Sequence, residues 1–173
     1  KANDFVADII KKEMTKTNTL LVNITSSAGS GKTTLMQKTA EKLKDKLTMA
    51  VMVGDLETER DAERIRETGE NVGNLVCPAS FDLGEDYRVT LMATTEGDDK
   101  PKKYPRMFLT SDMMLVSKSD LLPYLPFSVE AVTKDAREVN HELEVIQISS
   151  LTEEGIDTWC DWLIEKVKQK QQA

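Results

Sequence analysis

Short apolar runs alternate with amphipathic segments along most of this 173-residue chain. Five runs have the length of β-strands and lie at residues 19–25, 48–53, 88–94, 113–116 and 145–148. Between and after them, apolar residues recur every three or four positions, which is the period of one face of an α-helix. This alternation predicts an α/β fold with a mostly parallel sheet and helices on both of its faces.

The same pattern predicts which segments lie outside and which lie inside. A short N-terminal helix over about residues 4–15 should pack on the outside of the domain. The strand at 48–53 is almost entirely apolar, which suits a parallel strand that is buried on both faces. Three side chains of a partly helical segment near residues 101–110 should point inward: Tyr104, Phe108 and Leu109.

A glycine-bearing polar loop separates the first predicted strand from the helix after it. The loop reads Ser26-Ser-Ala-Gly-Ser-Gly-Lys-Thr-Thr34, and the helix extends to about Leu47. In a strand–loop–helix context the backbone N–H groups of such a loop and the helix N-terminus converge on an anion. We expect glycine at positions 29 and 31 because a Cβ would clash there. Lys32 should contact the outer phosphates, and the Thr33 hydroxyl should bind Mg²⁺.

The loop therefore predicts a P-loop NTPase. Its predicted phosphate-binding residues are Ala28, Gly29, Ser30, Gly31, Lys32, Thr33 and Thr34. The motif normally opens with glycine, and Ser26 stands in that place. A polar loop that merely caps a helix is the alternative, but Gly-Ser-Gly-Lys-Thr-Thr in this context argues against it.

Composition narrows the range of partners. The chain has 23 Lys and Arg against 30 Asp and Glu, a formal net charge of −7, which argues against nucleic acid or an anionic membrane as the main partner. The longest apolar runs are strand-sized and no targeting segment opens the sequence, so we expect a cytoplasmic protein with no membrane partner. The two cysteines, Cys77 and Cys160, provide no disulfide framework, and Cys160 lies on the apolar stripe of the last helix.

Polar clusters follow several of the predicted strands, and in a parallel sheet those strand ends share one edge. The most informative cluster is Ser117-Lys-Ser-Asp120. A carboxylate at Asp120 can accept hydrogen bonds from both N1–H and the amino group of guanine, a pair that adenine does not offer. Lys118 would lay its aliphatic stem along the base. A solvated turn is the alternative, and the position between the phosphate loop and Ser149-Ser150 argues against it.

Two acidic residues after the second predicted strand have open interpretations. Asp55 and Asp61 either contribute to a metal or phosphate site or have purely local roles. Asp55 would then be an ordinary turn residue, and Asp61 would complete a capping box that begins at Thr58. Spacing alone does not decide between these roles.

Longer segments resemble one protein family. Residues Glu70–Gly84, Thr95–Pro101 and Lys103–Pro105, with the phosphate loop and residues 54–64, closely resemble the HypB GTPases, which assist nickel insertion into [NiFe]-hydrogenase. The resemblance extends to the C-terminal helix and implies a single GTP-binding domain of the SIMIBI type. It also implies GTP hydrolysis to GDP and phosphate with Mg²⁺, and a nucleotide-linked homodimer. The implied partners are hydrogenase maturation proteins and the hydrogenase large subunit.

The resemblance also implies roles for individual residues. The implied catalytic residues are Lys32, Asp55 and Glu70. The implied Mg²⁺ ligands are Thr33, Asp61 and Glu70. The implied base-binding residues are Lys118, Asp120, Ser149 and Ser150. Cys77 would bind nickel or zinc at a site in the dimer interface.

Two features depart from the family pattern. Ser117 stands where the guanine motif usually has Asn, which bears on affinity or specificity. The family also carries a few dozen residues between the positions of Gly69 and Glu70: a strand, a Gly-Lys-x-Cys-His segment, a helix and the strand before the Glu. These residues are either omitted from this sequence or deleted. We favour omission, because losing a strand beside the phosphate loop would disrupt a close-packed core.

Other functions stay open at this point. A urease nickel GTPase of the UreG type shares the phosphate loop and the acidic strand end, but it does not resemble residues 71–84. A scaffold that binds nucleotide or metal without efficient hydrolysis is the non-enzymatic alternative. An ATPase of the partitioning or nitrogenase-iron-protein type is less consistent with the sequence, because the additional lysine that such proteins have early in the phosphate loop is absent here.

Overall fold

The computed structural model describes residues 2–53, 71–74 and 82–172. Its elements follow in the order α1 (Ala2–Lys16), β1 (Val22–Ser26), α2 (Lys32–Leu43), β2 (Ala50–Val53), β3 (Asn71–Asn74), β4 (Tyr87–Ala93), η1 (Thr94–Glu96), α4 (Lys100–Lys103), α5 (Pro105–Leu109), β5 (Met113–Ser117), η2 (Ser119–Tyr124), α6 (Val129–Val139), β6 (Glu144–Ile148) and α7 (Ile156–Gln172). The five predicted strands and the N- and C-terminal helices lie within a few residues of their predicted positions.

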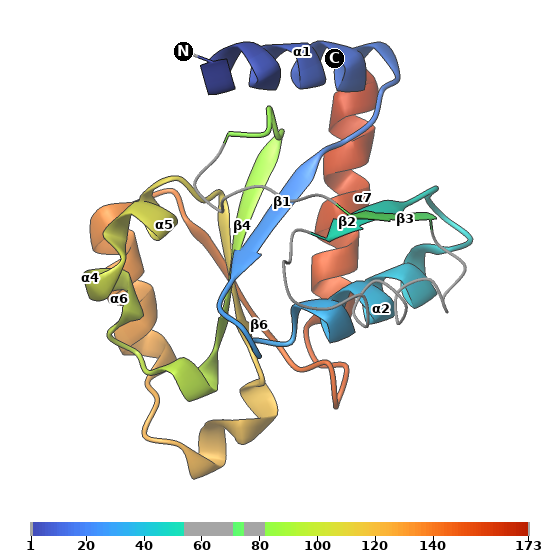
Figure 1. Cartoon of the computed structure of the whole chain (residues 1–173). Helices are drawn as coiled ribbons and strands as arrows, with labels where there is room; N and C mark the ends of the chain where they lie inside the picture. Colours follow the sequence, from blue (N-terminus) through green and yellow to red (C-terminus); the bar gives the residue numbers. More distant parts are fainter. Residues whose placement is uncertain (1, 54–70, 75–81, 173) are drawn as a thin grey trace.

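Four strands form one parallel sheet in the order β1-β4-β5-β6. The register places Val22 opposite Tyr87, and Met113 opposite both Val89 and Glu144. Because all three pairings are parallel, the carboxyl ends of the four strands meet at one edge. Helices α2 and α7 lie on one side of this sheet, and α4, α5 and α6 lie on the other (Figure 1). The predicted α/β fold with helices on both faces is confirmed.

Each face of the four-stranded sheet has its own apolar core, because successive side chains of a strand point to opposite faces. Toward α2 and α7, strands β4 and β5 contribute Val89, Leu91, Met113 and Leu115. Toward α5 and α6, the same strands contribute Met92, Met114 and Val116. All seven side chains are fully buried, so these two strands have helices on both faces and form the centre of the molecule.

Aromatic residues of α7 close the core on the α2 side. The Trp159 Nε1 donates a hydrogen bond to Thr39 Oγ1 of α2 at 3.0 Å, and both residues are buried. Trp162 stacks on Trp159 with ring centroids 5.5 Å apart and meets Tyr87 edge-on. Cys160 is buried beside them, as its place on the apolar stripe predicts, and burial raises the pKa of its thiol to about 11.

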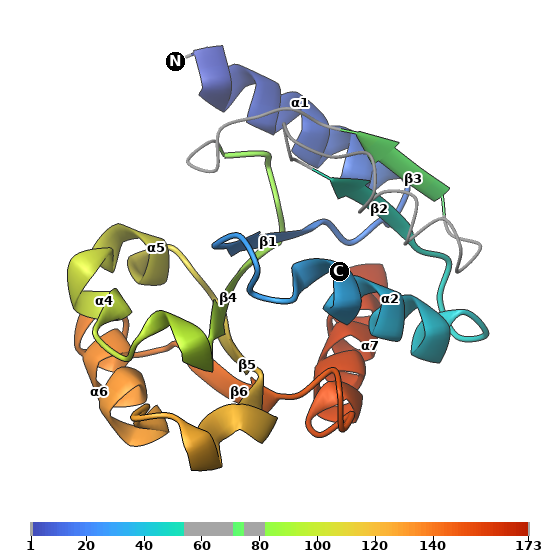
Figure 2. The ribbon, with the colours of Figure 1, turned by 60° about the horizontal axis from the view of Figure 1, so that its bottom comes forward.

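The expectation for the second predicted strand is wrong. β2 does not join the four-stranded sheet. It pairs in parallel with β3 in a separate two-stranded sheet, and Met52 is 57% exposed. Figure 2 shows this pair apart from the strands of the main sheet. Apolar composition favours a strand but does not specify its partner, and β3 has too little apolar pattern of its own to be predicted.

The segment after β4 is also only partly as predicted. Phe108 is fully buried, but Tyr104 and Leu109 are exposed. The helical pattern is interrupted at Tyr104, and a second short helix starts at Pro105. Proline has no N–H to continue a helix but is well suited to the first helical position. The interruption shifts the helix phase, which turns the two side chains outward.

A carboxylate fixes the loop that leads into β4. Glu85 accepts hydrogen bonds from Leu83 N at 2.7 Å, from Asn23 Nδ2 at 3.1 Å and from Arg88 Nε at 2.7 Å. Burial alone would raise the pKa of Glu85, but its own backbone N–H and these donors outweigh burial and hold that pKa below its ordinary value. Such a carboxylate stabilises the folded state above its unfolded pKa, and the contribution is lost as pH falls through the folded pKa.

Replacing Glu85 by glutamine should therefore flatten the acid side of the stability profile. We expect the free energy of unfolding of the wild-type chain to fall as the pH drops below 4.5, the ordinary pKa of a glutamate, and that of Glu85→Gln to fall less. Urea denaturation at several pH values measures the difference. Glu142→Gln changes an exposed carboxylate and should keep the wild-type slope. A wild-type slope in Glu85→Gln would contradict the assignment.

Candidate nucleotide-binding site

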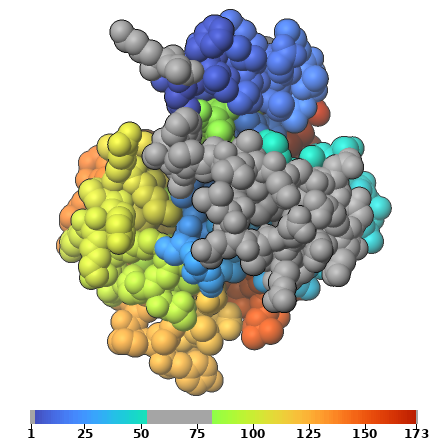
Figure 3. Space-filling view, in the orientation of Figure 1, coloured from blue at the N-terminus to red at the C-terminus, as the bar shows by residue number. Residues whose placement is uncertain are grey.

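The predicted phosphate loop connects the carboxyl end of β1 to the first turn of α2. Gly29 and Gly31 have φ angles of 72° and 94°, and α2 begins directly after Gly31. A Cβ built at either glycine meets no atom of the described residues within 4 Å, so the expected clash is wrong. Glycine is needed instead because residues that carry a Cβ rarely adopt a positive backbone φ angle. The blue segment that contains this loop reaches the surface beside the yellow-green α4 and α5 (Figure 3).

The loop lysine has a hydrogen-bond partner within the loop. Lys32 Nζ donates to Ser26 Oγ at 2.9 Å, so the serine that replaces the usual glycine accepts from the ammonium. The N-terminus of α2 adds free N–H groups, and its first turn has no acidic residue, which favours an anion there. The other predicted phosphate-binding residues lie along the same loop and turn: exposed Ala28 and Gly29, buried Ser30, and partly exposed Gly31, Thr33 and Thr34.

The predicted base-binding residues meet beyond the ends of β5 and β6. Ser149 is fully buried, and its Oγ donates to Asp120 Oδ1 at 2.5 Å while accepting from Thr152 N at 3.1 Å. These bonds fix the orientation of the carboxylate. Lys118 has a left-handed backbone with φ of 60°, and its carbonyl accepts from Thr94 Oγ1 at 2.9 Å. The next predicted residue, Ser150, is partly exposed.

One buried hydrogen bond joins the predicted base-binding residues to the predicted phosphate loop. Ser117 Oγ donates to the backbone oxygen of Ser30 at 2.7 Å, although the two residues are 87 positions apart. β4 lies between β1 and β5 in the sheet, which brings the two strand ends near each other. Ser117 thus connects the two parts of the site from the position where Asn is usual. The predicted phosphate and base residues share one edge, while their roles toward a nucleotide stay predictions.

Four predicted site residues lie outside the described part of the chain: Asp55, Asp61, Glu70 and Cys77. Among the described residues, no group of three or more His, Cys, Asp and Glu is placed to hold a metal ion. Nor is any helix within residues 2–53 and 82–172 long and apolar enough to cross a membrane.

Sequence reasoning missed Lys100. This residue is 5% exposed, its Nζ donates to Ser27 Oγ of the phosphate loop at 2.7 Å, and it forms an ion pair with Glu96. The available signal was the spacing of glutamate and lysine four positions apart directly after a strand end. In the sequence, however, the charged run Glu96-Gly-Asp-Asp-Lys100 has the composition of a solvated loop.

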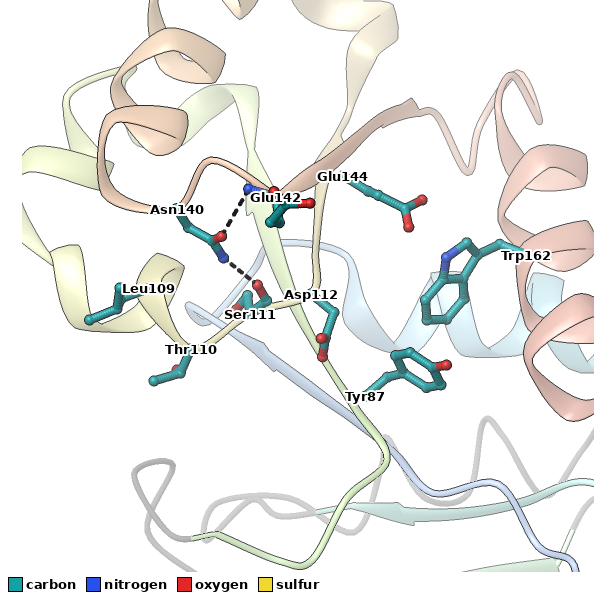
Figure 4. A pocket seen from close by; sticks show the side chains of 9 residues that line it. All are labelled: Tyr87, Leu109, Thr110, Ser111, Asp112, Asn140, Glu142, Glu144 and Trp162. Carbon is teal, nitrogen blue, oxygen red and sulfur yellow. Dashed lines mark hydrogen bonds between the residues drawn. The ribbon is translucent and has the colours of Figure 1, made fainter. Parts of the chain in front are cut away.

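A separate pocket of about 280 Å³ lies at the opposite edge of the sheet (Figure 4). It is lined by Tyr87, Leu109, Thr110, Ser111, Asp112, Asn140, Glu142, Glu144 and Trp162. Asn140 bridges part of its wall, donating to the Ser111 carbonyl at 2.7 Å and accepting from Glu142 N at 3.2 Å. Because Tyr87 and Glu144 begin their strands, this pocket is at the amino ends and not at the edge where open parallel sheets bind ligands.

A parallel sheet, a glycine loop before a helix N-terminus and polar clusters on one sheet edge define a P-loop nucleotide-binding protein. Residues 20–79 and 83–147 match the CobW/HypB/UreG nucleotide-binding domain. The chain belongs to this family, and within it to the HypB proteins, as the following similarities show.

Two curated relatives illustrate the similarity. The chain is 46% identical to the hydrogenase maturation factor HypB of Escherichia coli, in a match that covers 83% of this chain and 62% of that protein. It is 32% identical to the probable hydrogenase maturation factor HypB of Methanocaldococcus jannaschii, in a match that covers 98% of this chain and 93% of the relative. The chain thus spans about three fifths of the E. coli protein and nearly all of the archaeal one.

Two solved structures share the fold. The crystal structure of HypB from Helicobacter pylori in complex with nickel matches with a TM-score of 0.91 and 27% identity, over 98% of this chain and 96% of that one. The structure of the hydrogenase maturation factor HypB from Archaeoglobus fulgidus matches with a TM-score of 0.89 and 27% identity, over 96% and 98% of the two chains.

The length of the E. coli alignment bears on the expected missing segment. That alignment runs over 180 positions, whereas 83% of 173 residues is about 144 residues. The relative therefore has about 36 more positions within the matched region than this chain provides. The location of the missing segment, between Gly69 and Glu70, stays a prediction.

Removing the Ser117 hydroxyl should destabilise the chain. In Ser117→Ala the Ser30 carbonyl loses a buried donor, and we expect the free energy of unfolding to fall by about 1–2 kcal/mol. Ser119→Ala is the matched control, because the Ser119 hydroxyl is buried nearby without a hydrogen-bond partner among the described residues. Its loss should be close to neutral. Equal losses in urea denaturation would show that the bond to Ser30 is not responsible.

Proposed function

We propose that this chain binds and hydrolyses GTP and assists nickel insertion during maturation of [NiFe]-hydrogenase. The observation that carries the nucleotide part is the hydrogen bond from Ser117 to the Ser30 carbonyl, which joins the base-binding residues to the phosphate loop. The names of the relatives support the role in nickel insertion, because the relatives are hydrogenase maturation factors and one HypB structure was solved in complex with nickel.

The arrangement at Asp120 supports guanine as the base. Ser149 occupies one acceptor site of the carboxylate, which has about four, so both oxygens keep capacity for donors from the base. At about 1.5–3 kcal/mol for each charge-assisted bond, two bonds to guanine would separate it from adenine by roughly 3–6 kcal/mol. That difference corresponds to roughly a hundred- to ten-thousand-fold in affinity.

The phosphate loop would act on the triphosphate by charge and position. Lys32 would exchange its bond to Ser26 for phosphate oxygens, and the N–H groups at the start of α2 would contact the same anion. The Thr33 hydroxyl in this first turn fits Mg²⁺, which prefers oxygen ligands and, when bound, neutralises charge on the outer phosphates. By resemblance, Asp55 and Glu70 complete the catalytic set with Lys32, and Asp61 and Glu70 join Thr33 around the ion.

Cys77 is the proposed ligand for nickel or zinc. A thiolate is a good ligand for either ion, and a homodimer would supply two copies of it. We propose that GTP links the two subunits and that hydrolysis rearranges the metal site for transfer. The proposed partners are hydrogenase maturation proteins and the hydrogenase large subunit, and we place the protein in the cytoplasm.

With Mg²⁺ present, the purified chain should release phosphate from GTP much faster than from ATP. Lys32→Ala should abolish this turnover, because the ammonium that balances the outer phosphates is removed. A phosphate-release assay on both nucleotides measures the effect. Lys44→Ala changes an exposed lysine at the far end of α2 and should keep wild-type activity.

Two other results would contradict parts of the proposed function. Equal turnover of GTP and ATP would contradict the guanine assignment. Tight binding of a non-hydrolysable GTP analogue in isothermal titration, without turnover of GTP, would favour a nucleotide-binding scaffold over an enzyme.

Nickel binding should depend on one cysteine and not on the other. Cys77→Ala should weaken Ni²⁺ binding by about tenfold or more, because a thiolate ligand is lost. Cys160→Ala should leave it unchanged, because that thiol is buried and its pKa is raised to about 11. Equilibrium dialysis with Ni²⁺ compares the two variants, and equal weakening would exclude Cys77 as a specific ligand.

A further inference from the structure

Lys100 is a buried lysine on the nucleotide-binding edge, and the proposed function leaves it without a role. It is the first residue of α4 and is 5% exposed. Its Nζ donates to Ser27 Oγ at 2.7 Å and pairs with the Glu96 carboxylate. A buried ammonium is costly unless it is both paired and hydrogen-bonded, so these two contacts are what keep the side chain in this place.

Glu96 is itself fixed by the end of β4. Its Oε1 accepts from Ala93 N at 3.0 Å, and its other oxygen accepts from Lys100. Burial alone would raise the pKa of Glu96, but the hydrogen bonds from Lys100, Ala93 and the Ser27 side chain outweigh burial and lower that pKa. The carboxylate is therefore charged at neutral pH and connects the lysine to the sheet.

The other partner of this lysine belongs to the phosphate loop. The Ser27 carbonyl accepts from Ser30 N at 3.4 Å, which closes the turn before Gly31. The neighbouring Ser26 accepts from Lys32. Two ammonium groups thus bind two successive serines. Lys32, from the loop itself, binds Ser26, and Lys100, from α4 on the face of the sheet opposite α2, binds Ser27.

We propose that Lys100 is a positioning residue that holds the phosphate loop in its anion-binding shape through Ser27. The inference rests on the proposed nucleotide binding and adds a residue to that site. The loop is exposed at its tip, so a contact that restrains it reduces the conformational entropy lost when phosphates bind. Lys100 does not need to touch the nucleotide to have this effect.

A double-mutant cycle on nucleotide affinity tests the contact. Ser27→Ala removes the acceptor, and Lys100→Met combined with Glu96→Gln removes the donor without leaving a buried unpaired charge. Each change should weaken binding of fluorescent GDP with Mg²⁺ by about tenfold. The three substitutions together should also cost about tenfold, because both changes break the same contact, that between Ser27 and the Lys100–Glu96 pair. A loss of about a hundredfold would mean independent effects and would overturn the proposal.

Two conservative controls separate positioning from general damage. Ser27→Thr keeps a hydroxyl and should retain near-wild-type affinity. Lys102→Ala removes an exposed lysine of the same short helix, paired with Asp135 at 2.8 Å, and should also bind normally. A tenfold loss in either control would overturn the assignment to Lys100 and Ser27.

Amide hydrogen exchange of the nucleotide-free chain distinguishes failure of this proposal from failure of the proposed function. Breaking the contact should speed exchange at residues 26–31 several-fold relative to Lys102→Ala, whether or not the chain prefers GTP. Unchanged exchange would overturn the positioning role even if GTP binds tightly. Faster exchange in a chain that binds no nucleotide would support the contact and overturn only the proposed function.

Discussion

The parallel pairing of β4 with β1 on one side and β5 on the other determines where the site forms. Backbone hydrogen bonds make these pairings, and both faces of β4 and β5 are covered by apolar cores. The loops beyond β1 and β5 therefore start from neighbouring points on a rigid frame. Serine stands at positions 26 and 117, where the phosphate and guanine motifs usually have other residues. The frame tolerates this, because the strands bring the two loops close together and the loops do not depend on those side chains alone.

Serine hydroxyls make most of the short connections within the site. Ser26 accepts from Lys32, Ser27 accepts from Lys100, Ser117 donates to a loop carbonyl, and Ser149 donates to Asp120. A serine side chain is short and loses little rotamer freedom, so it fixes the distance between its own backbone and its partner closely. The result is a continuous set of contacts from the phosphate loop to the predicted base-binding residues, in which the Ser149 Oγ alone makes three hydrogen bonds, to Asp120 Oδ1, Leu151 N and Thr152 N.

Features with a local pattern could be predicted from the sequence, and features that depend on distant pairing could not. The phosphate loop, the core strand 113–116 and the buried Cys160 follow from apolar periodicity and motif spacing. The partner of β2 could not be predicted, because apolar composition names no partner. Tyr104 points outward because the helical segment is interrupted before Pro105, and apolar periodicity alone does not locate that interruption. Lys100 was missed because its acceptor lies 73 positions away.

The enclosure of Cys160 between α2 and α7 has a practical consequence for chemical probes. The chain has two cysteines, and this one is 3% exposed, with burial raising its thiol pKa to about 11. Alkylating reagents attack the thiolate, which this residue does not present at neutral pH while the protein is folded. Any labelling of the native chain by maleimide then reports on position 77 alone. A labelling experiment directed at that position therefore does not require Cys160 to be replaced.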